Sequence, residues 1–467
     1  MSHTFKTLSP IDQSVYVERP FANERDIQQA IEMAEKAKPL WRNVPLSTRE
    51  TLCSKAIDAL VANKESIANE ICWQMGRPIR YAAGELAGLE ERARYMIAHA
   101  KDALSPIYPS EQSGFSRYIK REPLGLVFVM SPWNYPYLTA VNSIIPAIMA
   151  GNVVLLKHST QTPLVAERFA KAFALAGLPE GVFQYLHLTH ADTEQLIQKA
   201  PIQHVVFTGS VSGGQQVEQA AAGRFLSMGL ELGGKDPAYV RHDADVDLAV
   251  ATTIDGAFFN SGQSCCAIER IYVHQDLFKP FVSKAIALVK QYKLGRSDDE
   301  ATTLGPLVRA SAADFVREQI KEALAMGAIA HINKQGFNLD QPGSAYLAPE
   351  ILTNVHHGMR IMTEESFGPV VGIMSVGGDD EAIKWMNDSD YGLTASVFTK
   401  DIAAGINIGE QLDTGTFFIN RCDYLDPALA WSGVKQSGRG CSLSILGYES
   451  LTRPKSFHIK TQGTLET

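Results

Sequence analysis

The chain has 467 residues, 45% of them hydrophobic and 20% charged, which is long enough for about two to four domains with large buried cores. Its formal net charge of −8 argues against a nucleic-acid partner, because binding a phosphate backbone needs a basic face.

The sequence also bears on compartment and metal content. We expect neither a secretory signal nor a membrane span, because the most apolar stretch, residues 144–156, is short and interrupted by proline, glycine and asparagine. The six cysteines are scattered and show no paired CxxC pattern, so we expect no metal site. A reducing cytoplasm suits such a chain best.

The first hundred residues are predicted to be helical. Apolar residues recur at helical spacing through residues 24–103, as in Ile27, Ile31 and Ala34. Residues 105–114 are rich in proline, serine and glycine, which is typical of a crossing or hairpin segment.

From residue 125 short apolar strands alternate with helices. We predict strands at 125–132, 152–157, 182–186 and 204–210, with helices at 142–150, 163–176 and 192–199 between them. Strands joined by helices form right-handed crossovers and a parallel sheet, the architecture of a dinucleotide-binding domain.

A second set of elements follows residue 232. It contains a predicted helix at 247–259, a strand at 270–275, a long helix ending at 293 and a strand at 369–376. The tail, residues 455–467, is extended and polar. It has no obvious element to pack on, so we expect it to add a strand to a neighbouring subunit.

Cys265 is the first candidate for chemistry. It follows Gly262 and Gln263 in the run FFNSGQSCC, after a predicted helix. A nucleophilic thiol needs exposure and surroundings that favour the thiolate, and a loop at a helix end can supply both. The alternative is a buried cysteine acting as a small apolar residue, which is the commoner case for an isolated cysteine.

Two polar residues are further candidates. Glu231 precedes a glycine pair in LELGGK, and a carboxylate in an apolar pocket has a raised pKa and can act as a base near neutral pH. Asn134 follows a strand end, where its amide could donate to a developing oxyanion. A solvated loop glutamate and a turn asparagine are the respective alternatives.

A phosphate site is also indicated. The run FTGSVSGG, residues 207–214, places glycine and serine between a strand and a helix start, where a helix N-terminus can meet phosphate. Lys157 ends a neighbouring strand, at the edge where open parallel sheets bind cofactors. The alternative for Lys157 is an ordinary surface lysine, and the glycine run does not match GxGxxG.

Taken together, these motifs resemble those of the aldehyde dehydrogenase superfamily. They occur in that family's order, with a strand-end lysine at Lys157, and they span almost the whole chain. The motifs are WNYP at Trp133, FTGS at Phe207, ELGGK at Glu231, GQSC at Gly262, ESFGP at Glu365 and SGVKQSGRG at Ser432.

The resemblance implies an α/β fold in three parts. A Rossmann-type cofactor domain would take residues 1–104 and 124–232, and an α/β catalytic domain residues 233–432. A small β oligomerisation element would take residues 105–123 and 447–467, giving a homodimer or homotetramer.

The resemblance also implies an NAD(P)-dependent oxidation of an aldehyde to the acid. Cys265 would attack the aldehyde, Asn134 and the Cys265 backbone N–H would hold the oxyanion, and Glu231 would activate the hydrolytic water. The residues that would contact NAD or NADP are Trp133, Lys157, Thr160, Gly209, Ser210, Gly214, Glu365 and Phe367.

The sequence departs from the family pattern in two features of this site. Thr160 stands where strongly NAD-selective members carry a glutamate that would repel a 2′-phosphate, so we expect NADP to be accepted beside or instead of NAD. Cys441 and Ser442 replace an Arg-Glu pair, so a second carboxylate is missing and Glu231 is expected to act alone.

The substrate tunnel shows a third departure. Asn142 and Phe259 occupy the positions at which succinate-semialdehyde enzymes carry arginine, which disfavours an aldehyde with a distal carboxylate. Phe259, Leu425 and Trp431 favour an uncharged aliphatic or aromatic aldehyde. Asp423 and Asp426, expected to be solvated loop residues, leave an amino-aldehyde as an alternative.

Two other functions compete with this reading. CoA-acylating members tend to lack the glutamate of ELGGK, whereas Glu231 is present and favours hydrolysis. A non-catalytic binding relative would be expected to lose Cys265, Glu231 or Asn134, and all three are present.

Overall fold

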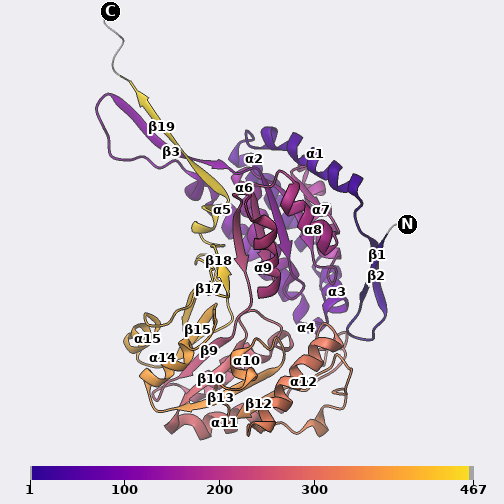
Figure 1. Ribbon diagram of the computed structural model, residues 1–467, viewed down its shortest axis with the longest axis vertical. Helices are drawn as coiled ribbons and strands as arrows, with labels where there is room; N and C mark the ends of the chain where they lie inside the picture. The colour runs from indigo at the N-terminus through magenta and orange to yellow at the C-terminus, as the bar shows by residue number, and fades with distance from the viewer. Residues whose placement is uncertain (1–2, 462–467) are drawn as a thin grey trace, which may run out of the picture.

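The computed structural model describes residues 3–461, which form two α/β halves and a projecting arm (Figure 1). The amino-terminal segment begins with a hairpin and continues as helices, as the periodicity predicts. Asn23 and Asp26 form a capping box at the start of the first helix. These elements are β1 (Thr4–Leu8), β2 (Val15–Pro20), α1 (Glu24–Trp41), α2 (Leu46–Val61), α3 (Lys64–Met75), α4 (Ile79–Ala82) and α5 (Gly84–Leu104).

The first sheet has six strands in the order β18-β8-β7-β4-β5-β6, and only β18 is antiparallel to its neighbour. This confirms the predicted parallel sheet. Its strands are β4 (Leu126–Ser131), β5 (Val153–His158), β6 (Phe183–Tyr185), β7 (His204–Thr208), β8 (Ser227–Glu231) and β18 (Gly438–Arg439), and its helices are α6 (Pro136–Ala150), α7 (Leu164–Ala176), α8 (His190–Lys199) and α9 (Val211–Ala221).

Helix α6 begins earlier than predicted. It starts at Pro136 instead of residue 142, because proline suits the first turn of a helix. Almost every residue of α6 is buried, so the helix has no polar face whose spacing would have marked its first turns.

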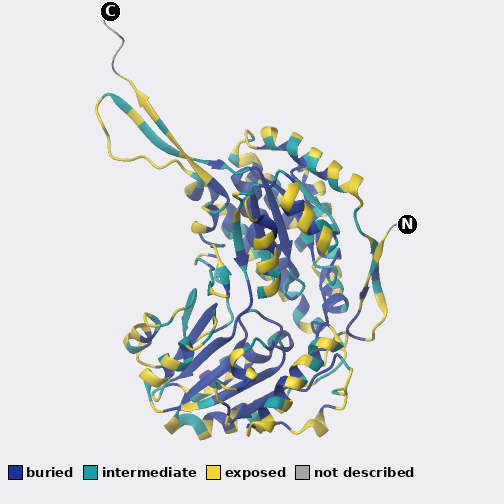
Figure 2. Ribbon diagram, viewed as in Figure 1, coloured by how far each residue is buried: buried dark blue, intermediate teal, exposed yellow. Residues whose placement is uncertain are grey.

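The second sheet has seven strands in the order β11-β12-β13-β10-β9-β15-β16 and is parallel except at β11. Its strands are mostly buried (Figure 2), and two clusters of buried apolar side chains pack on it. Its strands are β9 (Asp236–Val240), β10 (Ile268–His274), β11 (Ile329–Ala330), β12 (Glu350–Thr353), β13 (Val370–Val376), β15 (Thr394–Phe398) and β16 (Thr416–Ile419). Its main helices are α10 (Val246–Phe258), α11 (Gln275–Val289), α12 (Ala310–Ala325), α14 (Asp379–Asn387) and α15 (Ile402–Gly409).

A short segment, residues 232–235, carries the chain from β8 in the first sheet to β9 in the second. It is held on both sides. The backbone N–H of Leu232 donates to the carbonyl of Ser437 (3.0 Å), and the Ser437 hydroxyl donates to the carbonyl of Gly233 (2.7 Å). Lys235 is buried and forms an ion pair with Glu269. This fixed junction sets the position of the last residue of β8, Glu231.

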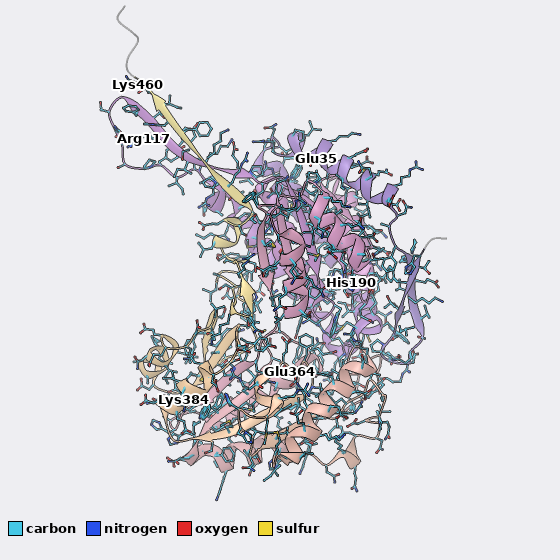
Figure 3. The ribbon with its side chains drawn as sticks, viewed as in Figure 1. Glu35, Arg117, His190, Glu364, Lys384 and Lys460 are labelled. Atoms are coloured by element: carbon cyan, nitrogen blue, oxygen red, sulfur yellow. The ribbon has the colours of Figure 1, made fainter. Side chains whose placement is uncertain are left out.

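The arm consists of β3 (Phe115–Pro123) and β19 (Thr452–Lys460), paired antiparallel along their whole length. Its side chains are mostly exposed or half-buried, and the labelled Arg117 and Lys460 lie far from the body (Figures 2 and 3). The premise that the tail has nothing of its own to pack on is therefore wrong, because β19 pairs with β3 of the same chain. Residues 462–467 of the predicted tail strand lie outside the described residues.

Candidate active site

Cys265 lies on a tight loop between α10 and β10. A single 3-10 turn, Phe259–Gly262, precedes it, and Asn260 and Ser261 have φ values of 54° and 57°. Gly262 has φ +72°, and an added Cβ would lie 2.3 Å from the Gly368 carbonyl oxygen, so only glycine fits there. The loop leaves Cys265 half-buried, whereas the next residue, Cys266, is fully buried.

Cys265 lines two cavities. The first has a volume of about 390 Å³ and lies among β4, β7 and the junction at Glu231. The second has a volume of about 750 Å³ and lies beside α5, α6 and α10. A molecule in either cavity can contact Cys265, so two reactants can meet at this residue.

Asn134 is fixed beside the Cys265 loop. Its side-chain Nδ2 donates to the carbonyl of Gln263 (3.2 Å), which leaves the second N–H of that amide available. Its own carbonyl accepts from Arg77 Nη2 (2.6 Å) and Asn260 Nδ2 (3.2 Å). An amide so held can stabilise negative charge that develops next to the thiol.

Arg77 and Glu85 support this arrangement, and no sequence motif pointed to them. They form a fully buried ion pair. Arg77 Nε donates to Asn260 Oδ1 (3.1 Å), and Glu85 Oε1 accepts from the backbone N–H of Tyr137 (2.7 Å) at the start of α6. Both residues belong to the amino-terminal helical segment, and nothing in their local sequence reveals that they contact this loop.

Glu231 ends β8 and lines the smaller cavity. Its Oε1 accepts from the Ser442 hydroxyl (2.5 Å) and its Oε2 from the Thr208 hydroxyl (3.2 Å). Burial raises the pKa of Glu231, and these two hydrogen bonds oppose the rise. Ser442, one of the two residues expected to replace an Arg-Glu pair, therefore binds Glu231 through a hydroxyl and supplies no second carboxylate.

Five of the predicted cofactor residues line the smaller cavity together: Trp133, Gly209, Ser210, Glu365 and Phe367. The Trp133 and Phe367 rings meet edge to face, with centroids 5.7 Å apart. Ser210 caps α9, where its hydroxyl accepts from the N–H of Gly213 (3.2 Å). Burial raises the pKa of Glu365 to about 8, and its Oε1 accepts from the N–H of Gly234 (3.0 Å). The labelled Glu364 marks this region in Figure 3.

The other three predicted cofactor residues lie outside that cavity wall. Lys157 pairs with Met130 in the β4–β5 register, so it lies at the carboxyl edge of the next strand, where burial lowers its pKa. Thr160 follows β5, and its carbonyl accepts from the Thr7 hydroxyl (2.7 Å). Gly214 is buried in α9, where an added Cβ would lie 2.7 Å from Leu232.

These features fit a dinucleotide. The cavity, the N-terminus of α9 and the ends of β5 and β7 follow one edge of the parallel sheet, where such folds bind nucleotides. Gly233 also allows Glu365 to lie close, since a Cβ there would be 2.4 Å from the Glu365 carboxylate.

The larger cavity has mainly aromatic and apolar walls, including Phe259 and Leu425 as the sequence suggested, together with Tyr135, Leu138 and Tyr292. Asn142 and Trp431 are placed elsewhere. Asn142 is buried and lines a third cavity together with Ser442 and Ser450. Trp431 is buried in the core.

One of the two loop aspartates, Asp423, differs from the expectation of a solvated residue. Asp423 lines the cavity and accepts from Cys266 Sγ (2.9 Å) and the Ser264 hydroxyl (3.2 Å), and burial raises its pKa to about 6. Asp426 instead accepts from the N–H of Ala428 (2.8 Å) within its own loop turn. Only Asp423 is therefore part of the cavity.

Comparison with known proteins agrees with this fold and site. The model of the aldehyde dehydrogenase family matches residues 1–457. A succinate-semialdehyde dehydrogenase [NADP(+)] of Deinococcus radiodurans is 34% identical over 451 residues, covering 97% of this chain and 94% of that protein.

Solved structures agree as well. The NADP-dependent glyceraldehyde-3-phosphate dehydrogenase from Bacillus halodurans C-125, complexed with NADP, is 31% identical with a TM-score of 0.92, covering 98% of this chain and 96% of that one. The betaine aldehyde dehydrogenase from Staphylococcus aureus in complex with NAD+ is 29% identical with a TM-score of 0.92, covering 99% and 93%.

The chain therefore belongs to the aldehyde dehydrogenase family, and both the resemblance seen in the motifs and the predicted α/β fold class are confirmed. It is an NAD(P)-dependent aldehyde dehydrogenase.

Proposed function

We propose that this enzyme oxidises its aldehyde to the carboxylic acid through a covalent intermediate on Cys265. The observation that carries the proposal is that Cys265 lines both cavities while Asn134 and Glu231 flank the smaller one. The aldehyde enters through the larger cavity, and the dinucleotide binds in the smaller one.

The first step forms a carbon–sulfur bond. The Cys265 thiolate attacks the aldehyde carbon, and the carbonyl π electrons move onto the oxygen. The free N–H of Asn134 Nδ2 and the backbone N–H of Cys265 donate to that oxyanion. When bound, NAD or NADP supplies the hydride acceptor, and loss of hydride from the former aldehyde carbon leaves a thioester on Cys265.

The second step hydrolyses the thioester. Glu231 accepts a proton from water while the water oxygen attacks the thioester carbon, and the Cys265 thiolate then leaves with the released electron pair. The raised pKa of Glu231 makes it a stronger base than an ordinary carboxylate. Its hydrogen bonds to Ser442 and Thr208 hold it at the edge of the cavity between turnovers.

The cofactor contacts follow from the same geometry. Glu365 and Phe367 would hold the nicotinamide-side ribose and Ser210 the pyrophosphate, and Trp133 and Gly209 line the same cavity. Lys157, at the end of the adjacent strand, and the nearby Thr160 serve its adenine-side ribose, and Gly214 lets α9 pack closely.

Initial rates of nicotinamide reduction, followed by absorbance, test this proposal. We expect turnover of a medium-chain aldehyde by the wild type and none by Cys265→Ala. Cys72→Ala removes a buried thiol of α3 that lines neither cavity and retains turnover. Cys265→Ala must lose turnover while it keeps the thermal unfolding transition of the wild type. Equal turnover by wild type and Cys265→Ala would refute the mechanism and favour a non-catalytic binding role.

We also propose that the arm forms the contact between subunits of a homodimer or homotetramer. The proposed limits of the cofactor domain, the catalytic domain and the oligomerisation element remain those predicted from the sequence. Its paired strands carry stacked aromatic side chains, such as Tyr118 and Phe457 with centroids 4.6 Å apart, on a projection that the body does not cover. Shortening β3 and β19 together should lower the mass in solution, measured by light scattering. An unchanged mass would contradict this role.

A reducing compartment such as the cytoplasm suits the protein, since all six of its cysteines are free. None of the helices within residues 3–461 is long and apolar enough to cross a membrane.

A further inference from the structure

The larger cavity contains a buried cation that the sequence motifs did not indicate. Arg92, on α5, lines this cavity together with Cys265 and is only 8% exposed. Its Nη1 donates to the Leu138 carbonyl (3.1 Å) and to Asn142 Oδ1 (3.3 Å). Within residues 3–461 its Nε and Nη2 donate to no protein group, and no carboxylate forms an ion pair with it.

Two other buried arginines of this chain, Arg77 and Arg270, are bound more completely. Arg77 forms an ion pair with Glu85 and also donates to Asn260 and to the Asn134 carbonyl. Arg270 donates through all three of its nitrogens, mainly to backbone carbonyls. Buried charges are normally paired and buried polar groups normally hydrogen-bonded, so the free edge of Arg92 needs an explanation.

Anchoring α5 to α6 explains only part of Arg92. Those contacts use a single nitrogen, Nη1. The nitrogens left over, Nε and Nη2, form the edge of the guanidinium that carries two parallel N–H groups. This edge matches the two oxygens of a carboxylate.

Arg92 also lies close to the reacting centre. Its charge interacts with Glu231, Cys266, Glu85 and Cys265, and Glu85 is already paired with Arg77. Burial lowers the pKa of Arg92, because the charged form has lost its water. An anionic group in the cavity would replace that lost solvation.

The carboxylates of the cavity wall do not supply this partner. Asp423 already accepts from Cys266 and Ser264. Glu91 accepts from the Tyr424 hydroxyl (3.0 Å), and both Glu91 and Asp255 are exposed, where solvent screens them. The inner wall therefore carries Arg92 and Asp423, which form no ion pair with each other, and the guanidinium edge of Arg92 stays free.

We propose that Arg92 binds a carboxylate of the substrate, so that the preferred substrate is a short aldehyde that itself carries a carboxylate. This inference rests on the proposed function and names its substrate class. It replaces the sequence-based expectation of an uncharged aldehyde, which depended on the lack of arginine at Asn142 and Phe259. The cation comes from α5 instead, and Asn142 orients it.

A single guanidinium edge favours a carboxylate over a phosphate, since enzymes usually surround a phosphate with several cations and helix N-termini. Family membership does not decide the charge of the substrate. The relatives include enzymes named for succinate semialdehyde, for glyceraldehyde 3-phosphate and for betaine aldehyde.

The test compares three four-carbon aldehydes on the whole enzyme: succinate semialdehyde, butanal and 4-aminobutanal. We expect the wild type to show its highest kcat/KM for succinate semialdehyde. Arg92→Gln should lower that value by about 10- to 100-fold, as expected for loss of a hydrogen-bonded charge, while butanal changes by only a few-fold. Arg92→Lys keeps the charge but loses the paired N–H groups. Its kcat/KM for succinate semialdehyde should lie between those of the wild type and Arg92→Gln.

Two controls separate binding from folding. Asp255→Asn removes an exposed charge from the same cavity and should leave the preference for succinate semialdehyde unchanged. Succinate, which cannot be oxidised, should inhibit butanal oxidation by the wild type competitively against butanal, and Arg92→Gln should lose this inhibition. The inhibition measures carboxylate binding directly.

A preference of the wild type for butanal or 4-aminobutanal, or for glyceraldehyde 3-phosphate as a fourth substrate, would overturn the inference. An equal loss with all aldehydes in Arg92→Gln would do the same, since that pattern marks a structural role. In each of these cases Cys265-dependent turnover persists and the proposed function stands. Absence of Cys265-dependent turnover with every aldehyde would instead reject the proposed function itself.

Discussion

The contact between Ser442 and Glu231 makes a sharp prediction about the pH dependence of turnover. The Ser442 hydroxyl donates to Glu231 Oε1 at 2.5 Å and stabilises the carboxylate form of a buried base. Ser442→Ala removes that donor and leaves Thr208 on the other oxygen. The pKa of Glu231 therefore rises further, and the acid limb of the kcat profile moves to higher pH, because the base acts only when it is deprotonated.

The size of the shift can be bounded. A hydrogen bond to a charged group contributes about 1.5–3 kcal/mol, and one pKa unit corresponds to about 1.4 kcal/mol. The shift is therefore about one to two pH units. We expect the lower end, since Glu231 lines a cavity and water can replace part of the lost bond.

The assay is kcat against pH for saturating aldehyde and dinucleotide, after a burst of product in the first turnover shows that thioester hydrolysis limits the rate. Ser450→Ala is a matched control. Ser450 lines the third cavity together with Ser442, but its hydroxyl donates to the Gly447 carbonyl (3.3 Å) and not to Glu231. The reasoning is refuted if Ser442→Ala and Ser450→Ala give the same acid limb while Glu231→Gln blocks hydrolysis.

Three further predictions concern the oxyanion site and the cofactor residues. Asn134→Ala should lower kcat by about 100- to 1,000-fold without changing thermal unfolding, because the Asn134 backbone, not its side chain, holds Arg77; a loss under tenfold would contradict the oxyanion role. The wild-type preference for NAD over NADP, measured as a ratio of kcat/KM values, should stay below about a thousandfold, roughly 4 kcal/mol, and Thr160→Glu should raise it; a larger wild-type ratio would rule out the reading of Thr160. Burial raises the pKa of Glu365 from an ordinary 4.5 to about 8 in the folded state. Between these two pH values the folded protein binds one proton more than the unfolded chain. The free energy of unfolding therefore falls as pH rises through this range, by up to about 1.4 kcal/mol per pH unit. Denaturant unfolding of the dinucleotide-free enzyme should show a shallower fall in Glu365→Gln, and identical slopes would argue against the raised pKa.

Much of the fold was readable from local sequence. The strands at 125–132, 152–157 and 204–210 are short apolar runs between turn residues, and each is a strand of the first sheet. Such strands can be predicted from sequence because a strand buried on both faces needs apolar residues along its whole length, whatever its neighbours are. The same approach missed the first turns of α6, since a helix buried on all sides shows no periodic polar face.

The order of the motifs likewise indicated the family, and it pointed to Cys265 and Glu231 as the proposed nucleophile and base. Each motif is a contiguous run whose glycines and polar residues serve one local geometry, as Gly262 does beside Gly368. Local requirements of this kind are visible in sequence because they restrict the residue types that fit.

Only the tertiary structure decided which distant side chains act on these motifs. Ser442, near the carboxyl-terminal end of the chain, hydrogen-bonds to Glu231. Arg92 of α5 lines the larger cavity, and β19 pairs with β3. None of these partners has a distinctive local sequence, because a serine hydroxyl or a guanidinium takes its role from what packs beside it. Burial removes the water that would otherwise satisfy such groups, so their effect on the pKa of Glu231 and on the charge of the substrate cavity exists only once segments distant in the sequence have packed together.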